Sequence, residues 1–320
     1  MRIAAAESSY RDVRTGRCDS MRPVLWAAML AVLVACQVLP AHFSPLHAGE
    51  KTLYEQPSAY NNIVVTEDER GFRTLYFERG GARQSVVKPG DPDSLELPYI
   101  KAMLVGLALY DKPQRILIVG LGGGTLAKFL HKHYPRALID AVDIDPAVVE
   151  VARKFFEFRE DEKLRAHISD GRKFVEDHPG VYDLIFLDAY GADSIPYHLT
   201  TREFLLSVRK ALTPRGVVLG NIWSNASNSL HDSMVRTYLN VFEELYLLDV
   251  QGVANEILIA TARRLKLSRE DLATRARRVS QAKGFHFGLE KAVEYGYRRM
   301  DKKFTGGQVL TDAGKPVAAQ

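Results

Sequence analysis

The feature that most constrains the fold is a glycine-rich loop between an apolar strand segment and a helical segment. Residues 115–119 read RILIV, residues 120–125 read GLGGGT, and LAKFLHKHY follows. Glycine lets the backbone approach a ligand closely and adopt positive φ, and the N-terminus of the helix supplies unpaired amides. A strand, a glycine loop and a helix in this order indicate a nucleotide-binding α/β unit.

The segments after this loop continue the alternation. Strand-like runs at 137–142, 164–168, 182–187 and 217–219 are separated by helical segments such as DPAVVEVARKFF and TREFLLSVRKAL. Strands that alternate with helices are typical of a doubly wound parallel sheet, whose right-handed crossovers place the functional loops at one edge. The pattern therefore predicts an α/β, Rossmann-like fold with a parallel sheet within residues 110–262.

Shorter strands precede this region. The runs NIVVTE, FRTLYFE and RQSVV are separated by turn residues at 68–71 and 80–81, which is typical of antiparallel strands. We therefore divide the chain into a leader (1–50), a small N-terminal β domain (51–98), a Rossmann-like domain (99–262) and a basic helical C-terminal tail (263–320). Within the tail, Ser268 and Asp271 have the spacing of a helix capping box.

Composition excludes several kinds of chemistry. The net charge of +4, from 43 Lys and Arg against 39 Asp and Glu, is too balanced for a dedicated nucleic-acid binder. The only cysteines are Cys18 and Cys36, ahead of the predicted folded region. A disulfide framework, a cysteine-ligated zinc site and a thiol nucleophile are therefore excluded from that region, and we predict no metal site. Carboxylates, hydroxyls, histidines, backbone amides or a bound small molecule must supply the chemistry.

The leader contains the longest uncharged apolar run, VLWAAMLAVLVACQVL at 24–39, which follows Arg22. A short basic region before an apolar run is the pattern of a signal peptide. The sequence LVAC, which ends at Cys36, resembles the lipobox of bacterial lipoproteins. We therefore expect a cell-envelope location with membrane attachment through the N-terminus; if the start is mis-assigned, for example because translation begins at Met21, we expect a cytoplasmic protein.

Carboxylates stand where the predicted strands end. Asp143 lies about 20 residues beyond the glycine loop, where a carboxylate accepts hydrogen bonds from both ribose hydroxyls of a dinucleotide or of S-adenosylmethionine (SAM). Asp170 and Gly171 follow the third strand, and Asp188 follows the fourth. The last two carboxylates favour a SAM-type site over a dinucleotide site, although Asp170 is also a candidate N-cap for the next helix.

The segments IVGLGGGTLAKFL, AVDIDPAVVEVARKFF, SDGRKFV and YDLIFLDAY resemble the catalytic domain of the spermidine synthase (polyamine aminopropyltransferase) family, within the SAM-dependent methyltransferase-like superfamily. The resemblance extends from about Tyr60 to Val317. It includes YNNIVV, the segment around Gln84, ELPY ending at Tyr99, and VLTDAGKPV near the C-terminus.

The resemblance implies roles for particular residues. Asp143 would hold the ribose of the donor, Asp170 its adenine, and Gln84 the nucleoside or its tail. Asp188 would act as general base or electrostatic partner for the attacking amine, and Tyr99 would line the acceptor channel. The remaining residues implied in binding the donor are glycines, namely Gly120, Gly122, Gly123, Gly124 and Gly171.

The same resemblance implies transfer of an aminopropyl group from decarboxylated SAM to a polyamine acceptor. Decarboxylated SAM is a co-substrate here, and no tightly bound cofactor is expected. The expected partners are a polyamine or another small amine and a second copy of the chain in a homodimer, without nucleic acid.

Some positions depart from the family pattern. Gly123 stands where the family usually has an aspartate that favours decarboxylated SAM, and Lys101 stands near the position of a family glutamate. In the segment that follows Asp188, Asp193 only loosely replaces a second aspartate, and Tyr190 and His198 are further candidates for lining the site.

Two alternatives remain open at this point. One is a SAM-dependent methyltransferase of the same fold, which the glycine at position 123 favours. The other is a catalytically silent nucleoside-binding protein of the envelope, since an exported enzyme would lack an obvious supply of SAM. The three ligand-facing carboxylates argue against this second alternative.

Overall fold

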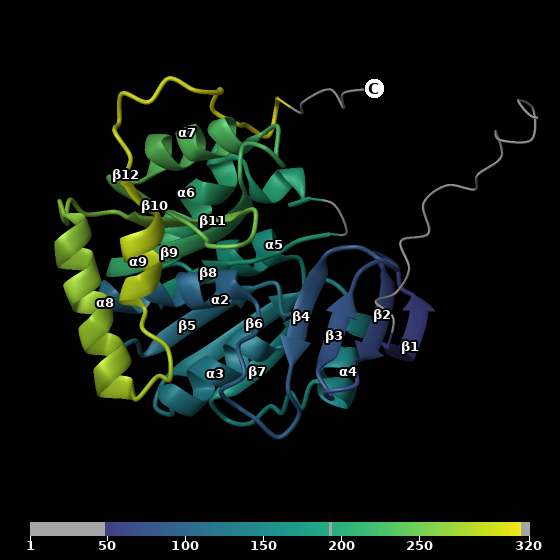
Figure 1. Ribbon diagram of the computed structural model, residues 1–320. Helices are drawn as coiled ribbons and strands as arrows, with labels where there is room; N and C mark the ends of the chain where they lie inside the picture. The colour runs from purple at the N-terminus through teal and green to yellow at the C-terminus, as the bar shows by residue number, and fades with distance from the viewer. Residues whose placement is uncertain (1–48, 192–193, 315–320) are drawn as a thin grey trace, which may run out of the picture. The chain divides into compact units, whose positions relative to one another are not determined.

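Two sheets organise the chain in the computed structural model, which describes residues 49–191 and 194–314. The order of strands across the larger sheet is β12 (Tyr297–Arg299), β10 (Glu244–Asp249), β11 (Asn255–Thr261), β9 (Leu212–Trp223), β8 (Tyr182–Leu187), β5 (Arg115–Val119), β6 (Leu138–Asp143) and β7 (Leu164–Ile168). Figure 1 shows these strands stacked beside the smaller sheet.

Strands β5 to β9 pair in parallel, which confirms the prediction from their alternation with helices. The prediction of a parallel sheet throughout residues 110–262 is wrong for β10 and β11. Strand β11 pairs antiparallel with both β9 and β10. Only residues 250–254 join β10 to β11, and so short a connection permits a hairpin but not a parallel crossover. Strand β12, in the segment predicted as a helical tail, extends this antiparallel part beside β10.

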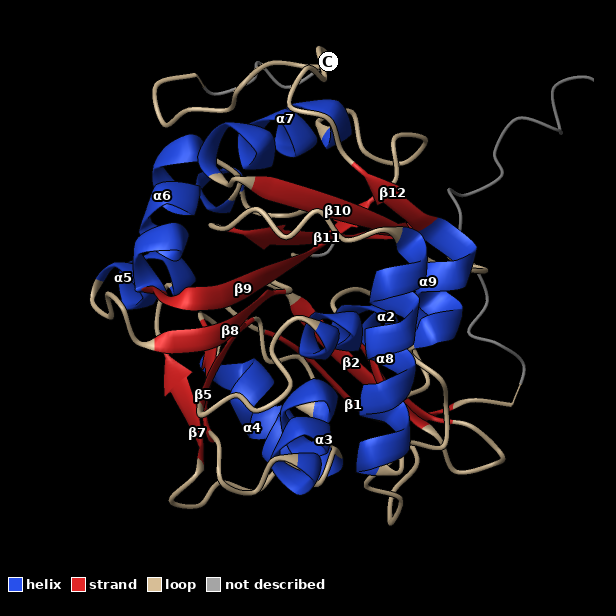
Figure 2. Ribbon diagram, turned by 90° about the vertical axis from the view of Figure 1, so that its left-hand side faces the viewer, coloured by secondary structure: helices blue, strands red, loops and turns tan. Residues whose placement is uncertain are grey.

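Helices cover both faces of the larger sheet because successive strand residues point to opposite sides. Ile116 and Ile118 of β5 belong to one core cluster, whereas Leu117 and Val119 belong to the other. The first cluster includes residues of α2 (Pro98–Met103), the short 3-10 helix η1 (Leu104–Ala108), α3 (Thr125–His133), α8 (Arg269–Lys283) and α9 (Glu290–Gly296). The second includes residues of α5 (Gly171–Glu176), α6 (Arg202–Ala211) and α7 (His231–Val241). Figure 2 shows the two groups on opposite sides of the sheet.

The smaller sheet confirms the prediction of an antiparallel N-terminal element. Its order is β1 (Lys51–Pro57), β2 (Asn62–Glu67), β3 (Arg73–Tyr76) and β4 (Arg83–Val87), and every pairing is antiparallel. Its apolar face packs against α4 (Pro146–Phe155), mainly through Ile63, Val65, Leu75 and Phe77 against Val148 and Val151. This packing brings β4 next to the glycine loop, where the Gly123 amide donates a hydrogen bond of 2.9 Å to Ser85 Oγ.

The C-terminal region packs on the rest of the described chain. The capping box predicted at Ser268 and Asp271 is present at the start of α8. Beyond β12 the chain runs past α7 (Figure 1), and Leu310 is buried in the same core as α6 and α7.

The predicted leader, including Cys18 and Cys36, lies outside the described residues. Within residues 49–191 and 194–314, no helix has the length and apolar character needed to cross a bilayer.

Candidate active site

The order of strands reverses between β5 and β8. From β5 the chain proceeds to β6 and β7 on one side, and it returns to the other side of β5 at β8. In an open α/β sheet, the loops on either side of such a reversal diverge and leave a crevice at the carboxyl edge. The loops after β5 and β8 meet at Gly120, which has φ of 98°. A Cβ there would lie 2.3 Å from the Asp188 carbonyl oxygen, so the site requires glycine.

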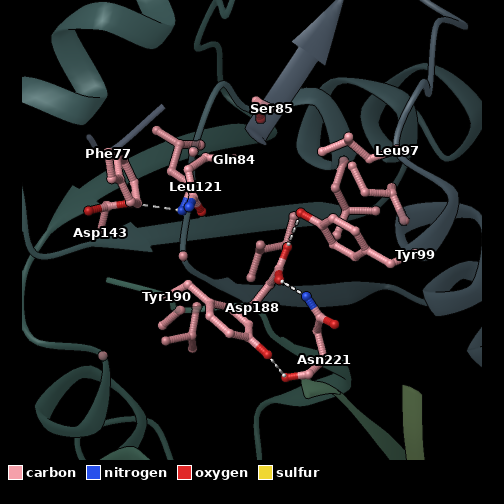
Figure 3. Close-up of a pocket in the computed structure, with 18 of the residues that line it drawn as sticks. Phe77, Gln84, Ser85, Leu97, Tyr99, Leu121, Asp143, Asp188, Tyr190 and Asn221 are labelled. Carbon is pink, nitrogen blue, oxygen red and sulfur yellow. Dashed lines mark hydrogen bonds between the residues drawn. The ribbon is translucent and has the colours of Figure 1, made fainter. Parts of the chain in front are cut away.

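A cavity of about 270 Å³ lies at this edge and draws its walls from both sheets. The predicted site residues that line it are Gln84, Tyr99, Gly120, Gly122, Asp143, Asp170, Gly171 and Asp188. In Figure 3, Asp143 lies beside Leu121, whereas Asp188 lies between Tyr99 and Asn221. The three strand-end carboxylates predicted from the sequence therefore line one cavity.

Asp143 is held by the glycine loop. Its carboxylate accepts hydrogen bonds from the backbone amides of Leu121 at 2.9 Å and Asp145 at 3.0 Å. Burial raises the pKa of Asp143, and these amide donors oppose the rise. Each carboxylate oxygen has a second lone pair, so Asp143 is still able to accept hydrogen bonds from a ligand's hydroxyl groups.

Asp170 is both a helix N-cap and a cavity residue. It is the N-cap of α5, where its side chain accepts from the Lys173 amide at 3.1 Å, and it also lines the cavity. Its other oxygen lies 3.0 Å from Nε2 of His198, a second cavity residue. From the sequence, His198 was predicted only to line the site. Its pairing with Asp170 depends on the tertiary structure.

Two side chains hold the Asp188 carboxylate in the cavity. Tyr99 Oη donates to its Oδ2 at 3.2 Å, and Asn221 Nδ2 donates to its Oδ1 at 2.8 Å. Asn255 Nδ2 in turn donates to Asn221 Oδ1 at 2.9 Å. The two residues predicted to be catalytic, Asp188 and Tyr99, are thus in direct contact, and a chain of two amides fixes the other side of the carboxylate.

Burial raises the pKa of Asp188 to about 7, while the hydrogen bonds from Asn221 and Tyr99 lower it. Burial also raises the pKa of Tyr99 well above its ordinary value, and the negative charge of Asp188 adds to this effect. Tyr99 is therefore a neutral hydrogen-bond donor at physiological pH. A carboxyl group with a pKa near 7 is suited to taking a proton from a bound amine.

Asn221, Asn255 and Asn61 are cavity residues that the sequence analysis missed. Asn221 is near the carboxyl end of β9. The rule that polar residues at the ends of parallel strands lie at one edge of the sheet, which identified the three aspartates, therefore applied to it as well. Asn255 begins β11 and reaches the same edge only because β11 is antiparallel. Asn61 precedes β2, and its Oδ1 is buried with no hydrogen-bond partner among the described residues.

Aromatic side chains form part of the cavity wall near Asp188. Tyr190 Oη donates to the Asn221 carbonyl oxygen at 3.2 Å, and the Tyr190 ring centroid lies 5.4 Å from that of Trp223. Lys101, which the resemblance placed near the position of a family glutamate, does not line the cavity, and its Nζ lies over the Phe287 ring at 5.4 Å. It therefore does not oppose a cationic ligand there. Asp193 lies outside the described residues.

Gly123 and Gly124, which the sequence analysis also assigned to donor binding, do not line this cavity. Gly124, with φ of 72°, is the N-cap of α3, where it turns the chain into the helix. A Cβ at Gly123 would lie 2.7 Å from the Phe156 ring and 2.9 Å from Ser85 Cβ, inside the protein. The loop therefore presents Gly120 and Gly122 to the cavity and packs the next two glycines against the core.

We expect Gly123→Asp to destabilise the fold and to leave donor preference unchanged. Phe156 is fully buried, and overpacking of this kind costs typically about 1–3 kcal/mol, to which the buried charge adds. Gly81→Asp is the control, since the three atoms nearest to a Cβ there all belong to the exposed side chain of Glu78. Thermal unfolding measures the difference. A Gly123→Asp protein as stable as Gly81→Asp and shifted toward decarboxylated SAM would contradict the packing argument.

Residues 98–246 match the spermine/spermidine synthase domain. A polyamine aminopropyltransferase from Vibrio vulnificus is 37% identical over 226 residues, which cover 68% of this chain and 74% of the relative. Human methyltransferase-like protein 13, solved in complex with SAH, is 31% identical with a TM-score of 0.52 and covers 66% of this chain and 98% of its own. Spermidine synthase from Thermotoga maritima shares the fold, with a TM-score of 0.60 at 20% identity, and covers 76% of this chain and 83% of its own.

Proposed function

Since the chain belongs to the spermine/spermidine synthase family, we propose that it transfers the aminopropyl group of decarboxylated SAM to the amine of a polyamine acceptor. The observation that carries this proposal is the position of Asp188. It lies in the same cavity as Asp143 and Asp170 and is held there by Tyr99 and Asn221.

In this reaction the nitrogen of the acceptor attacks the aminopropyl carbon bonded to the sulfonium. A C–N bond forms as the C–S bond breaks, and the electron pair of the broken bond goes to sulfur, which leaves as the thioether methylthioadenosine. The acceptor nitrogen loses a proton, and Asp188 is the group placed to receive it. A carboxylate also attracts the cationic acceptor, and both substrates in one cavity react with a lower entropic barrier.

The donor is held by the opposite part of the cavity in this proposal. Asp143 accepts hydrogen bonds from the ribose hydroxyls, and Asn61 lines the same cavity. Asp170 accepts from the adenine amine, and Gln84 contacts the tail. Gly120 and Gly122 allow close approach of the backbone to the nucleoside.

Methyl transfer from intact SAM is the second candidate. It is favoured by the 31% identity to methyltransferase-like protein 13, which was solved with SAH. Both candidates place the nucleoside in the same half of the cavity, so they differ in the group transferred and in the acceptor.

Turnover assays on the purified chain separate the candidates. We expect decarboxylated SAM with putrescine to give methylthioadenosine and an aminopropylated amine, both detected by mass spectrometry. Intact SAM with the same acceptor is the matched control, and formation of SAH with a methylated product would support the second candidate instead. Calorimetry with methylthioadenosine, SAM and decarboxylated SAM measures the donor site independently. Absence of nucleoside binding would contradict both candidates.

A further inference from the structure

The C-terminal segment 308–314, which contains most of the VLTDAGKPV motif, is held along its length by hydrogen bonds to the part of the chain that carries α5, α6 and α7. The Leu310 amide donates to Thr237 Oγ1 at 2.9 Å, and the Leu310 carbonyl accepts from the Arg202 amide at 2.7 Å. Tyr197 Oη donates to the Thr311 carbonyl at 3.0 Å. The segment therefore has a fixed position against the fold, and the Leu310 side chain anchors it in the core.

Asp312 makes the largest number of polar contacts in this segment. Arg172 donates through Nη1 to Oδ1 at 2.8 Å and through Nη2 to Oδ2 at 2.7 Å, which is the two-pronged geometry of the strongest ion pairs. Thr201 Oγ1 donates to Oδ1 at 2.7 Å, and the Asp312 amide donates to Glu203 at 3.0 Å. The hydrogen bonds from Arg172 hold the pKa of Asp312 below its ordinary value.

These contacts connect Asp312, which does not line the cavity, to residues that do. Arg172 is the second residue of α5, next to Asp170 and Gly171, and it does not itself line the cavity. Its Nη1 also donates to the carbonyl oxygen of His198 at 3.4 Å. His198 belongs to the short 3-10 helix η2 (Tyr197–Leu199), and its side chain bonds Asp170 inside the cavity. Thr201, the N-cap of α6, lies two residues beyond the end of η2.

We propose that Asp312 is a positioning residue for the donor site, because it holds the N-terminus of α5 and helix η2 together through Arg172 and Thr201. The relative position of these two elements sets where Asp170 and His198 stand in the wall that faces the adenine. This inference rests on the proposed function, in which that wall binds the donor nucleoside. Asp312 does not touch the donor and acts only through the residues it holds.

An exposed Arg–Asp pair by itself contributes little, so the contribution of Asp312 must be separated from an ordinary ion pair. Arg298 and Asp249 provide the matched control. They form a 2.6 Å pair that joins β12, in the C-terminal region, to β10, and neither residue lines the cavity.

The experiment measures the affinity for methylthioadenosine by calorimetry, together with donor KM and kcat, in the full chain. We expect Asp312→Asn to weaken the affinity by about 2- to 30-fold and to raise donor KM to a similar extent, with kcat at saturation nearly unchanged. Asp249→Asn should leave affinity and KM unchanged. Arg172→Lys retains the charge but loses the two-pronged contact, and we expect it to weaken the affinity in the same way.

A double variant tests whether Asp312 acts on the donor site through helix η2. If Asp312 acts through helix η2, the effect of Asp312→Asn on affinity is smaller when His198→Ala is already present, because the two changes then share one pathway. Unchanged affinity in both Asp312→Asn and Arg172→Lys would overturn the inference, as would a loss equal to that of Asp249→Asn. If the unaltered chain fails to bind methylthioadenosine, the proposed function is wrong and the inference is overturned with it. Should Asp312→Asn not fold, Arg172→Lys decides the question.

Discussion

We expect Asp188→Asn to reduce turnover by on the order of 10²- to 10⁴-fold while leaving donor affinity nearly unchanged, which is the usual effect of removing one positioned acid–base group. Asparagine preserves the shape of the side chain and the acceptor for one hydrogen bond. It neither takes the proton of the acceptor amine nor balances its positive charge. In the proposed geometry Asp188 contacts the acceptor and the reacting carbon, whereas Asp143 and Asp170 hold the nucleoside.

Steady-state kinetics and calorimetry with methylthioadenosine measure the two quantities separately. Asp140→Asn is the control, because Asp140 accepts hydrogen bonds from Tyr182 at 3.0 Å and pairs with His167, and it does not line the cavity. Its turnover should remain close to that of the unaltered chain. If Asp188→Asn abolishes nucleoside binding or leaves turnover intact, Asp188 does not have the function proposed for it.

The pH dependence of kcat/KM provides a second signature of Asp188. The pKa of about 7 describes the free protein, and kcat/KM reports the groups of the free enzyme. Activity should therefore rise with pH through about 7 as the carboxyl group ionises. The residual activity of Asp188→Asn should lack this step.

Stability should change with pH in the opposite direction to activity: ionisation of Asp188 increases activity but destabilises the folded state. Because folding raises the pKa of Asp188, the stabilising contribution of its protonated form is present at low pH and is lost as pH rises toward 7. Relative to the unaltered chain, Asp188→Asn should therefore become more stable as pH increases over this range.

Asp143→Asn should weaken donor binding by about 1.5–3 kcal/mol, which corresponds to roughly 10- to 150-fold in Kd. Its carboxylate accepts from Leu121 and Asp145 and is oriented for the ribose. An asparagine retains only one acceptor oxygen, and its amide group would face backbone N–H donors. The loss should appear in donor Kd and KM, with kcat at saturating donor much less affected than in Asp188→Asn.

Calorimetry with methylthioadenosine measures this loss, and thermal unfolding shows whether the loop itself is weakened. Asp161→Asn is a suitable control, since this partly exposed carboxylate pairs with His131 and does not line the cavity. An Asp143→Asn protein that binds the nucleoside as tightly as this control would remove Asp143 from the donor site.

Much of the cavity could be predicted from the chain itself because of one geometric rule. The carboxyl ends of parallel strands meet at a common edge, so a glycine loop after β5 and aspartates at or just beyond the ends of β6, β7 and β8 had to lie near one another. Local periodicity identified those strands, and the positions of Asp143, Asp170 and Asp188 followed from the strand ends. The capping box of α8 followed from spacing alone for a similar reason, since all of its hydrogen bonds are local.

The remaining features depend on contacts between distant segments, which local periodicity does not encode. Asn255 reaches Asn221 because β11 turns back antiparallel beside β9, and Asn61 reaches the cavity because the smaller sheet packs on α4. The glycines at 120–124 look alike in the sequence, yet Phe156 and Ser85 close around Gly123 while Gly120 and Gly122 face the cavity. Asp312 lies 140 residues from Arg172, and only the path of the C-terminal segment across the fold brings the two together. The sequence thus determined, through local patterns, which edge of the sheet carries the candidate nucleoside site. Long-range packing determined which residues surround Asp188 and brought Asp312 to Arg172, next to Asp170.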